Sequence, residues 1–245
     1  GIEPYIRQTE YRKVAAAAAE AAEGKCPVLV GVMDNSITRV LERIESLEGL
    51  KIDGVVATAP YYYASSPAEL KKYFETIALK SPYPLYLYDL PIVTKVKITA
   101  DTAEYLMSVD NIKGIKTGDI YTARELTRSK RGEDFSVMFS GLDVFDAAYQ
   151  YGIKMNLDGM FSCTPVTSGK MYRALEKGDM DLAGKCLDDI LKLRNTLVEV
   201  GTFSGFTYAM NILGYEGIFA PDYMYRNNPR DYEKVRECMK LCNMI

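Results

Sequence analysis

The fold is decided by the segment from Pro84 to Gly118, which reads PLYLYDLPIVTKVKITADTAEYLMSVDNIKGIKTG. It contains two short apolar runs, Pro84–Tyr88 (PLYLY) and Ile112–Lys116 (IKGIK), separated by an amphipathic stretch that begins near Thr99. Neither run shows the clean alternation of apolar and polar residues that a strand with one solvated face requires. Two such strands joined through a helix are typical of a parallel sheet whose outer face is covered.

The same strand and helix unit recurs along most of the 245 residues. A first helix over Gln8–Glu23, with Thr9 as its cap and Gly24 as its stop, precedes the repeats. The predicted strands are the apolar runs Pro27–Val32, Asp53–Thr58, Pro84–Tyr88, Ile112–Lys116, Phe135–Ser140 and Asp158–Ser162. The helices that follow them are predicted to begin near Asn35, Pro67, Thr99, Asp119, Asp143 and Thr164. This alternation predicts an α/β protein built from βα units.

Two parallel architectures compete for these six strands. An open doubly wound sheet ordinarily carries a G-x-G-x-x-G turn after an early strand, and the sequence contains none. A (β/α)8 TIM barrel has a typical length of ~250 residues, but it needs eight strands. Beyond Ser162 the pattern is only helical, over Thr164–Lys177, Met180–Val200, Ser204–Leu213 and Pro229–Cys242. We predict a barrel portion over residues 1–178 and a C-terminal helical domain over residues 179–245.

The composition excludes several classes of function. The 30 Lys and Arg against 33 Asp and Glu give a net charge of −3, without the basic stripe that nucleic acid requires. No apolar run reaches the ~18–20 residues that cross a bilayer. The absence of His excludes His-dependent nucleophiles and imidazole-based metal sites. Five scattered cysteines favour the reducing cytoplasm, and a small molecule becomes the expected partner.

Lysine is the one nucleophile type in this chain that forms covalent bonds to carbonyl groups without histidine, provided that burial keeps its amine neutral. Lys116 ends one predicted strand and Tyr88 ends another, and catalytic residues of parallel barrels lie at such strand ends. An imine-forming amine beside a proton-relaying phenol would result. From spacing alone, a solvated lysine and a core tyrosine are the more common explanations.

Five stretches add specificity because they occur in a fixed order: Pro60–Tyr63 (PYYY), Leu87–Pro91 (LYDLP), Gly114–Asp119 (GIKTGD), Ser140–Asp143 (SGLD) and Leu157–Ser162 (LDGMFS). Together they resemble the dihydrodipicolinate synthase / N-acetylneuraminate lyase family of class I aldolases. The resemblance covers essentially the whole chain. It implies a (β/α)8 TIM barrel with C-terminal helices, assembled as a homotetramer, and no cofactor.

The resemblance also implies residue roles. Lys116 would form the Schiff base with pyruvate, Tyr88 would relay protons, and Tyr62 would reach into a neighbouring subunit's site. The implied substrate-binding positions are Gly1, Thr117, Asp119, Asp143, Phe161 and Ser162. Two alternatives stay open: the tyrosines at positions 61–63 also suit an aromatic interface patch, and Asp119 and Asp143 also suit helix N-caps.

The sequence departs from the family pattern at the rim of the implied site. Val93 stands where synthases place an Arg that clamps the carboxylate of aspartate semialdehyde. Asp143 matches an acidic position of the sialic acid lyases, but Val144 replaces the acidic residue that follows it. The loop from Lys116 to Asp119 is two residues shorter than in relatives, and Val166 stands where Asn is usual.

These features lead to a principal hypothesis and two alternatives. The principal one is an aldolase or lyase that uses or releases pyruvate and acts on a 2-oxo-3-deoxy sugar acid, with an aldehyde or 2-oxo acid as partner. A dihydrodipicolinate synthase is the alternative within the same chemistry, and a catalytically idle barrel is the alternative from another class. By the resemblance, the six strands are strands three to eight, so a strand, a helix and a second strand are expected before Gly1.

Overall fold

The computed structural model describes residues 3–129 and 134–245, and the chain divides into two compact units. The sheet unit comprises Glu3–Gly141 and Tyr151–Met155, and the helical unit comprises Leu142–Gln150 and Asn156–Ile245. The domain boundary between residues 178 and 179 that the sequence suggests stays a prediction. The helix that ends at residue 177 packs with the helix that follows it.

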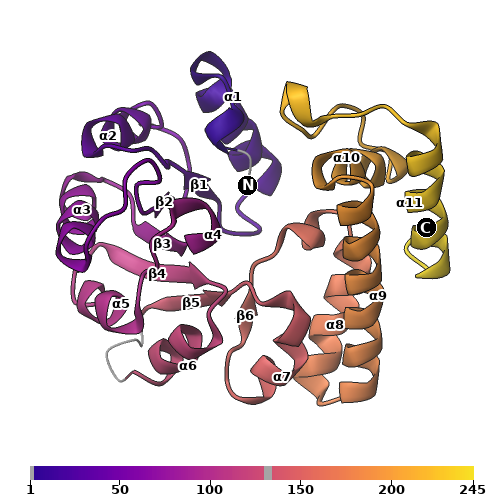
Figure 1. Ribbon diagram of the computed structural model, residues 1–245. Helices are drawn as coiled ribbons and strands as arrows, with labels where there is room; N and C mark the ends of the chain where they lie inside the picture. The colour runs from indigo at the N-terminus through magenta and orange to yellow at the C-terminus, as the bar shows by residue number, and fades with distance from the viewer. Residues whose placement is uncertain (1–2, 130–133) are drawn as a thin grey trace. The chain divides into compact units, whose positions relative to one another are not determined.

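Six short strands form one sheet, drawn as arrows in Figure 1. They are β1 (Leu29–Gly31), β2 (Gly54–Thr58), β3 (Leu85–Asp89), β4 (Ile112–Thr117), β5 (Ser136–Phe139) and β6 (Met155–Asn156). Their order in the sheet is their order in the chain, and each of the first four pairs in parallel with the next. Successive βα units produce this order, and the predicted α/β class is confirmed.

Six α-helices are described in the sheet unit, and four of them begin with a side-chain cap. They are α1 (Gln8–Ala22), α2 (Ile37–Glu45), α3 (Pro67–Lys80), α4 (Pro91–Thr94), α5 (Ala100–Leu106) and α6 (Ile120–Arg128). Ser36, Thr99 and Asp119 each accept a hydrogen bond from a backbone N–H of the first turn. Ser66 and Glu69 form a reciprocal capping box at α3. In Figure 1, α2, α3, α5 and α6 lie outside the strands.

Two glycines make room for Tyr86 on the inner face of the sheet. A Cβ at Gly54 would lie 2.7 Å from Tyr86 Cε2, and a Cβ at Gly114 would lie 2.7 Å from Tyr86 Cδ1. The aromatic ring therefore lies directly over the backbone of both neighbouring strands. Only glycine permits so close an approach at these two positions.

The helical unit contains α7 (Phe145–Gln150), α8 (Pro165–Lys177), α9 (Met180–Glu199), α10 (Thr202–Ile212) and α11 (Pro229–Leu241). The central helix α9 packs against α8, α10 and α11. Cys238 and Cys242 lie on the buried side of α11, and burial raises the pKa of the Cys242 thiol to about 12. Among the described helices, none combines the length and the apolar character that crossing a membrane takes.

Three predicted boundaries are wrong. The run Asp158–Ser162 is a 3-10 turn over Gly159–Ser162, because the Asp158 carboxylate accepts the Met160 N–H at 2.8 Å and bends the chain. Thr9 lies inside α1, whose N-cap position is Arg7. A 3-10 turn over Leu142–Val144 contains Asp143, and α7 starts only after it.

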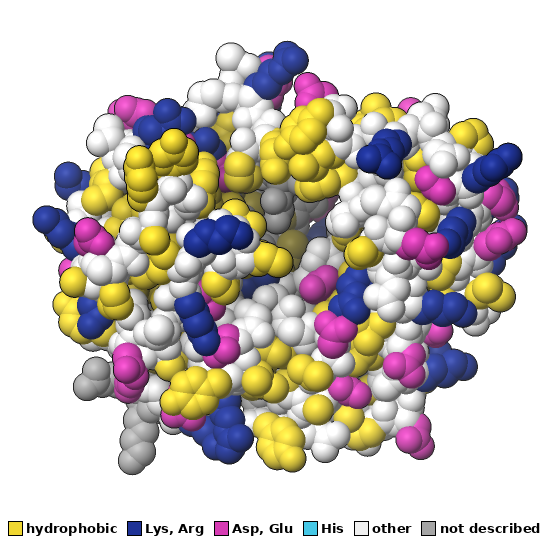
Figure 2. All heavy atoms as spheres, in the orientation of Figure 1, with side chains coloured by type: hydrophobic (Ala, Val, Ile, Leu, Met, Phe, Trp, Pro, Cys, Tyr) yellow, Lys and Arg dark blue, Asp and Glu magenta, His cyan; other side chains and the backbone are white. Residues whose placement is uncertain are grey.

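Positive and negative side chains are interspersed over the face of the molecule drawn in Figure 2. This distribution agrees with the small net charge of −3. It gives the viewed face no extended field of one sign.

Candidate active site

The side chains of Lys116 and Tyr88 meet at the carboxyl ends of β4 and β3. The Lys116 Nζ donates a hydrogen bond to the Tyr88 hydroxyl at 3.0 Å and lies 4.2 Å from the centre of its ring. Both residues are half-buried. A primary amine thus lies within proton-transfer distance of a phenol, which is the geometry that general acid and base catalysis requires.

An irregularity in the sheet creates this pair. Leu85 pairs with Ile112, but the next residue, Tyr86, pairs with Gly114, so the register shifts by one residue at Lys113. Without the shift, Tyr88 would lie opposite Ile115, which points to the other face of the sheet. With the shift, Tyr88 lies opposite Lys116. Bulges of this kind re-aim side chains near active sites.

Behind this pair, a buried carboxylate joins the ends of the same two strands. Asp89 is 3 % exposed and accepts hydrogen bonds from the Thr117 hydroxyl at 2.8 Å and from the Ile98 N–H at 2.9 Å. Burial is the largest influence on this carboxyl group, and its pKa is raised above the ordinary value despite both donors. Asp89 thereby connects the residue after Tyr88 to the residue after Lys116.

Asp119 is held by several partners at the start of α6. Its Oδ1 accepts the Thr122 N–H at 2.7 Å, and its Oδ2 pairs with Lys97 at 2.8 Å. Its own N–H donates to the Thr117 hydroxyl at 3.1 Å. Lys97 and the Thr122 N–H outweigh the effect of burial, so the pKa of Asp119 is lowered. Asp119 therefore caps α6, as the alternative interpretation predicts, and it lies two residues after Thr117, the last residue of β4.

Tyr62 lies on the loop after β2 and is turned toward solvent. Its side chain is 78 % exposed and that of Tyr63 is 79 % exposed, and the two rings contact edge to face at 4.9 Å. The structure shows no hydrogen bond between Tyr62 and Lys116 or Tyr88. Within one chain, therefore, Tyr62 makes no hydrogen bond to either Lys116 or Tyr88.

The remaining sequence candidates lie elsewhere. Asp143, half-buried Phe161 and exposed Ser162 belong to the helical unit. Both Asp143 oxygens accept hydrogen bonds from the Arg194 guanidinium at 2.7 Å, which lowers the pKa of the carboxyl. The Ser162 hydroxyl donates to the Gly159 carbonyl. Gly1 lies outside the described residues.

Sequence analysis did not single out Asp89, Lys97 or Asn35, which the structure brings to the strand ends. Asp89 directly follows Tyr88, so its position at the end of the same strand is a sequence signal that could have identified it. Asn35 pairs with backbone groups more than 25 residues away, and no local pattern indicates such a contact.

Comparison with known proteins gives a consistent result. The model of the Dihydrodipicolinate synthetase family matches residues 1–221. A curated relative, the 4-hydroxy-tetrahydrodipicolinate synthase of Bradyrhizobium diazoefficiens, is 28 % identical over 222 residues, which are 87 % of this chain and 73 % of the relative.

Solved structures show the same fold. Dihydrodipicolinate synthase from Thermotoga maritima superposes with a TM-score of 0.89 at 20 % identity, over 100 % of this chain and 85 % of that one. The chloride-inhibited dihydrodipicolinate synthase from Acinetobacter baumannii, solved in complex with pyruvate, has a TM-score of 0.87 at 22 % identity, over 99 % and 84 %.

Proposed function

Since the chain belongs to the dihydrodipicolinate synthetase family, whose members are class I lyases and aldolases with a Schiff-base lysine, we propose that Lys116 forms an imine with pyruvate. The observation that carries this proposal is the 3.0 Å contact between Lys116 Nζ and the Tyr88 hydroxyl. The two residues stand in register on neighbouring strands, where no loop movement is needed to bring them together.

The chemistry follows from the two groups. The uncharged Lys116 amine adds to the C2 ketone of pyruvate and gives a carbinolamine, and loss of water from that adduct gives the imine. The protonated imine accepts the electron pair that remains when a C3 proton leaves, and an enamine forms. The enamine carbon then attacks a carbonyl carbon of the second substrate, and the reverse sequence cleaves the same bond. Tyr88 supplies and removes the protons at the former ketone oxygen.

Two second substrates are each favoured by one observation. The curated relatives are named 4-hydroxy-tetrahydrodipicolinate synthase, and this favours condensation of pyruvate with aspartate semialdehyde. Val93, a 52 % exposed apolar residue on α4, offers no charge to a carboxylate and favours a hydroxylated 2-oxo acid instead. The names come from matches over most of the chain, so aspartate semialdehyde is the first acceptor to test.

The other proposed roles depend on assembly or on loops. Exposed Tyr62 and Tyr63 support an oligomer, proposed as a homotetramer, in which Tyr62 reaches the site of a neighbouring subunit. Thr117 and Asp119 are proposed to border the pyruvate site, since they lie one and three residues after Lys116. For Asp143, Phe161 and Ser162 the proposal of substrate contact rests on the family resemblance.

Reduction with borohydride in the presence of pyruvate tests the imine. We expect one reduced pyruvate on the Lys116 peptide, detected by mass spectrometry, and none in the Lys116→Ala variant. Lys113→Ala is the matched control, because Lys113 lies on the same strand and should leave the adduct unchanged. A folded protein that forms no adduct, or forms it on Lys113, contradicts the proposal.

A second assay needs no knowledge of the acceptor. Enamine formation releases a C3 proton of pyruvate, so the enzyme in D2O should exchange these protons for deuterium, which NMR detects. Tyr88→Phe should slow this exchange by about 10²- to 10⁴-fold, the usual range for loss of a general acid or base. Tyr86→Phe, on the same face of the same strand, is the matched control and should leave the rate unchanged.

A further inference from the structure

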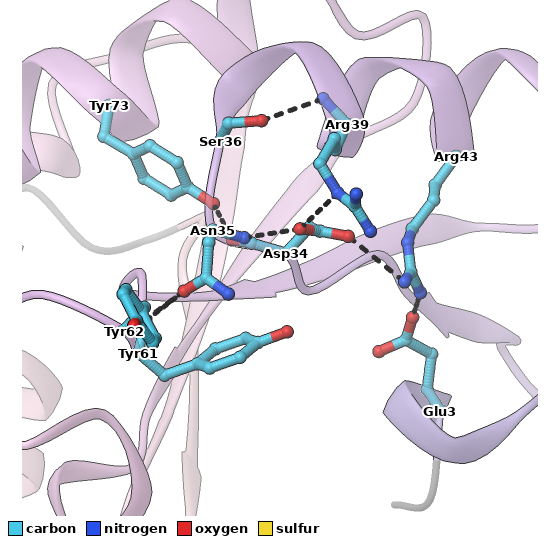
Figure 3. A network of polar contacts seen from close by, with 9 residues as sticks. All are labelled: Glu3, Asp34, Asn35, Ser36, Arg39, Arg43, Tyr61, Tyr62 and Tyr73. Atoms are coloured by element: carbon cyan, nitrogen blue, oxygen red, sulfur yellow. Dashed lines mark hydrogen bonds and ion pairs between the residues drawn. The ribbon is translucent and has the colours of Figure 1, made fainter.

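One side chain makes the hydrogen bonds that hold the backbone of the tyrosine loop, residues 61–63, to the rest of the sheet unit, and the half-buried Tyr61 side chain anchors the start of this loop. The Asn35 Oδ1 accepts the Tyr61 N–H at 2.9 Å and the Tyr62 N–H at 2.8 Å (Figure 3). These are the only hydrogen bonds to the backbone of the loop that the structure shows among the described residues. The Tyr62 and Tyr63 side chains are largely exposed and give the loop little packing.

Asn35 is itself fixed by a buried carboxylate. Asp34 is 3 % exposed, and its Oδ1 accepts the Asn35 N–H at 2.7 Å and the Arg39 Nε at 2.8 Å. Its Oδ2 accepts the Arg43 guanidinium at 3.2 Å, and Arg43 also pairs with Glu3. Two cations from α2 therefore hold the carboxylate from one side, as Figure 3 shows.

The backbone at this point is fixed from α3 as well. The Tyr73 hydroxyl donates to the Asp34 carbonyl at 3.1 Å, and burial raises the pKa of Tyr73, so that the hydroxyl stays a donor. The Asp34 and Asn35 backbone is thus held by side chains from α2 and α3. An amide whose backbone is fixed in this way gives its acceptor oxygen a defined place.

From these contacts we propose that Asn35 is a positioning residue for Tyr62. The Asn35 Oδ1 atom accepts hydrogen bonds from two adjacent N–H groups and so fixes the path of the loop backbone. This path determines where the exposed Tyr62 phenol points. Asn35 touches no reacting atom and acts only through the tyrosine. This inference rests on the proposed function, because it requires Tyr62 to take part in turnover.

The path of a loop matters for rate because catalytic groups tolerate little displacement. A misplacement of about 1 Å costs on the order of a hundredfold in rate. The two N–H groups of the loop can instead bond to water in an exposed segment. Loss of the Asn35 Oδ1 atom therefore leaves the fold intact, but the Tyr62 side chain is no longer held in one orientation.

The test is a double-mutant cycle with the deuterium-exchange assay. Asn35→Leu should lower kcat for exchange about tenfold to a hundredfold, with a smaller change in KM for pyruvate. Asn35→Asp keeps an acceptor oxygen in the place of Oδ1 and should stay within about threefold of wild type. In a Tyr62→Phe background, Asn35→Leu should change kcat by less than about twofold, because the residue through which it acts is already impaired.

Asn111 provides the matched control. Its amide donates to the carbonyls of Ala78, Ser81 and Tyr83, and it directly precedes β4, at the opposite ends of the strands. Asn111→Leu should lower stability without changing kcat per folded enzyme, in both the wild-type and the Tyr62→Phe backgrounds.

Each outcome has one meaning. If Asn35→Leu leaves kcat unchanged, or if its effect multiplies with that of Tyr62→Phe, the inference is wrong. If Tyr62→Phe itself exchanges at the wild-type rate, the inference is also wrong, while the imine at Lys116 stands. A wild-type protein that forms no borohydride adduct on Lys116 refutes the proposed function, and the inference fails with it.

Discussion

Gly114 leaves no room for a side chain between the backbone of β5 and the ring of Tyr86, and its substitution by alanine tests this packing. The added Cβ would lie 2.6 Å from the Ser136 carbonyl oxygen and 2.7 Å from Tyr86 Cδ1. The Ser136 oxygen is backbone of β5 and cannot move alone. The Tyr86 ring cannot retreat either, because its other edge lies over Gly54.

The magnitude follows from this double obstruction. Overpacking a well-filled core by one methyl group costs about 1–3 kcal/mol, and two immovable neighbours place Gly114→Ala at the upper end. Urea denaturation followed by circular dichroism should show a lower midpoint with an unchanged slope. Because Gly114 lies two residues before Lys116, deuterium exchange into pyruvate should also slow.

Gly184 is the matched control, since it lies in the helix α9 and a Cβ there meets nothing within 4 Å. Gly184→Ala should raise the free energy of unfolding by about 0.5–1 kcal/mol through helix propensity. A Gly114→Ala protein that is as stable as wild type would refute the packing described for Tyr86.

Three further substitutions give distinct signatures. Burial raises the pKa of Asp89, so this carboxyl favours folding at pH values below the ordinary carboxyl pKa, and that contribution is lost as the pH rises through the raised value. The free energy of unfolding of Asp89→Asn relative to wild type, measured by urea denaturation, should therefore increase as the pH is raised from below ~4. Arg194→Met should raise the pKa of Asp143 toward its ordinary value, seen by NMR, and cost less than about 1 kcal/mol because the pair is partly exposed. Ser66→Ala removes half of a capping box and should lower the free energy of unfolding, measured by urea denaturation, by about 1 kcal/mol.

Most of the parallel fold was predictable because its signals are local. The first five strands agree within one or two residues with the apolar runs, and the helices predicted near Pro67, Thr99 and Asp119 begin within one residue of those positions. The sixth strand was misplaced because Gly159–Ser162 is apolar enough for a strand, whereas the Asp158 side chain turns the chain. Apolar content alone does not separate a buried turn from a buried strand.

The sequence indicates which residues form the candidate site, but it does not indicate the register in which β3 and β4 pair. Lys116 and Tyr88 end their strands in the sequence, yet only the shift at Lys113 brings them opposite one another. A bulge depends on how two strands pair, so the sequence of one strand by itself does not indicate it. The same limit applies to Asn35, whose partners are residues 61 and 62.

The two halves of the proposed reaction depend on different kinds of structural element. Lys116 and Tyr88 lie on paired strands, and buried Asp89 joins those strands, so a change at any of the three disturbs the proposed imine site. Val93 lies on the four-residue helix α4, and Tyr62 lies on a loop held by one amide. Loops and short helices accept substitution with little cost to the fold. The pyruvate half of the reaction is therefore set by the sheet, and the second substrate is set by the elements that follow it.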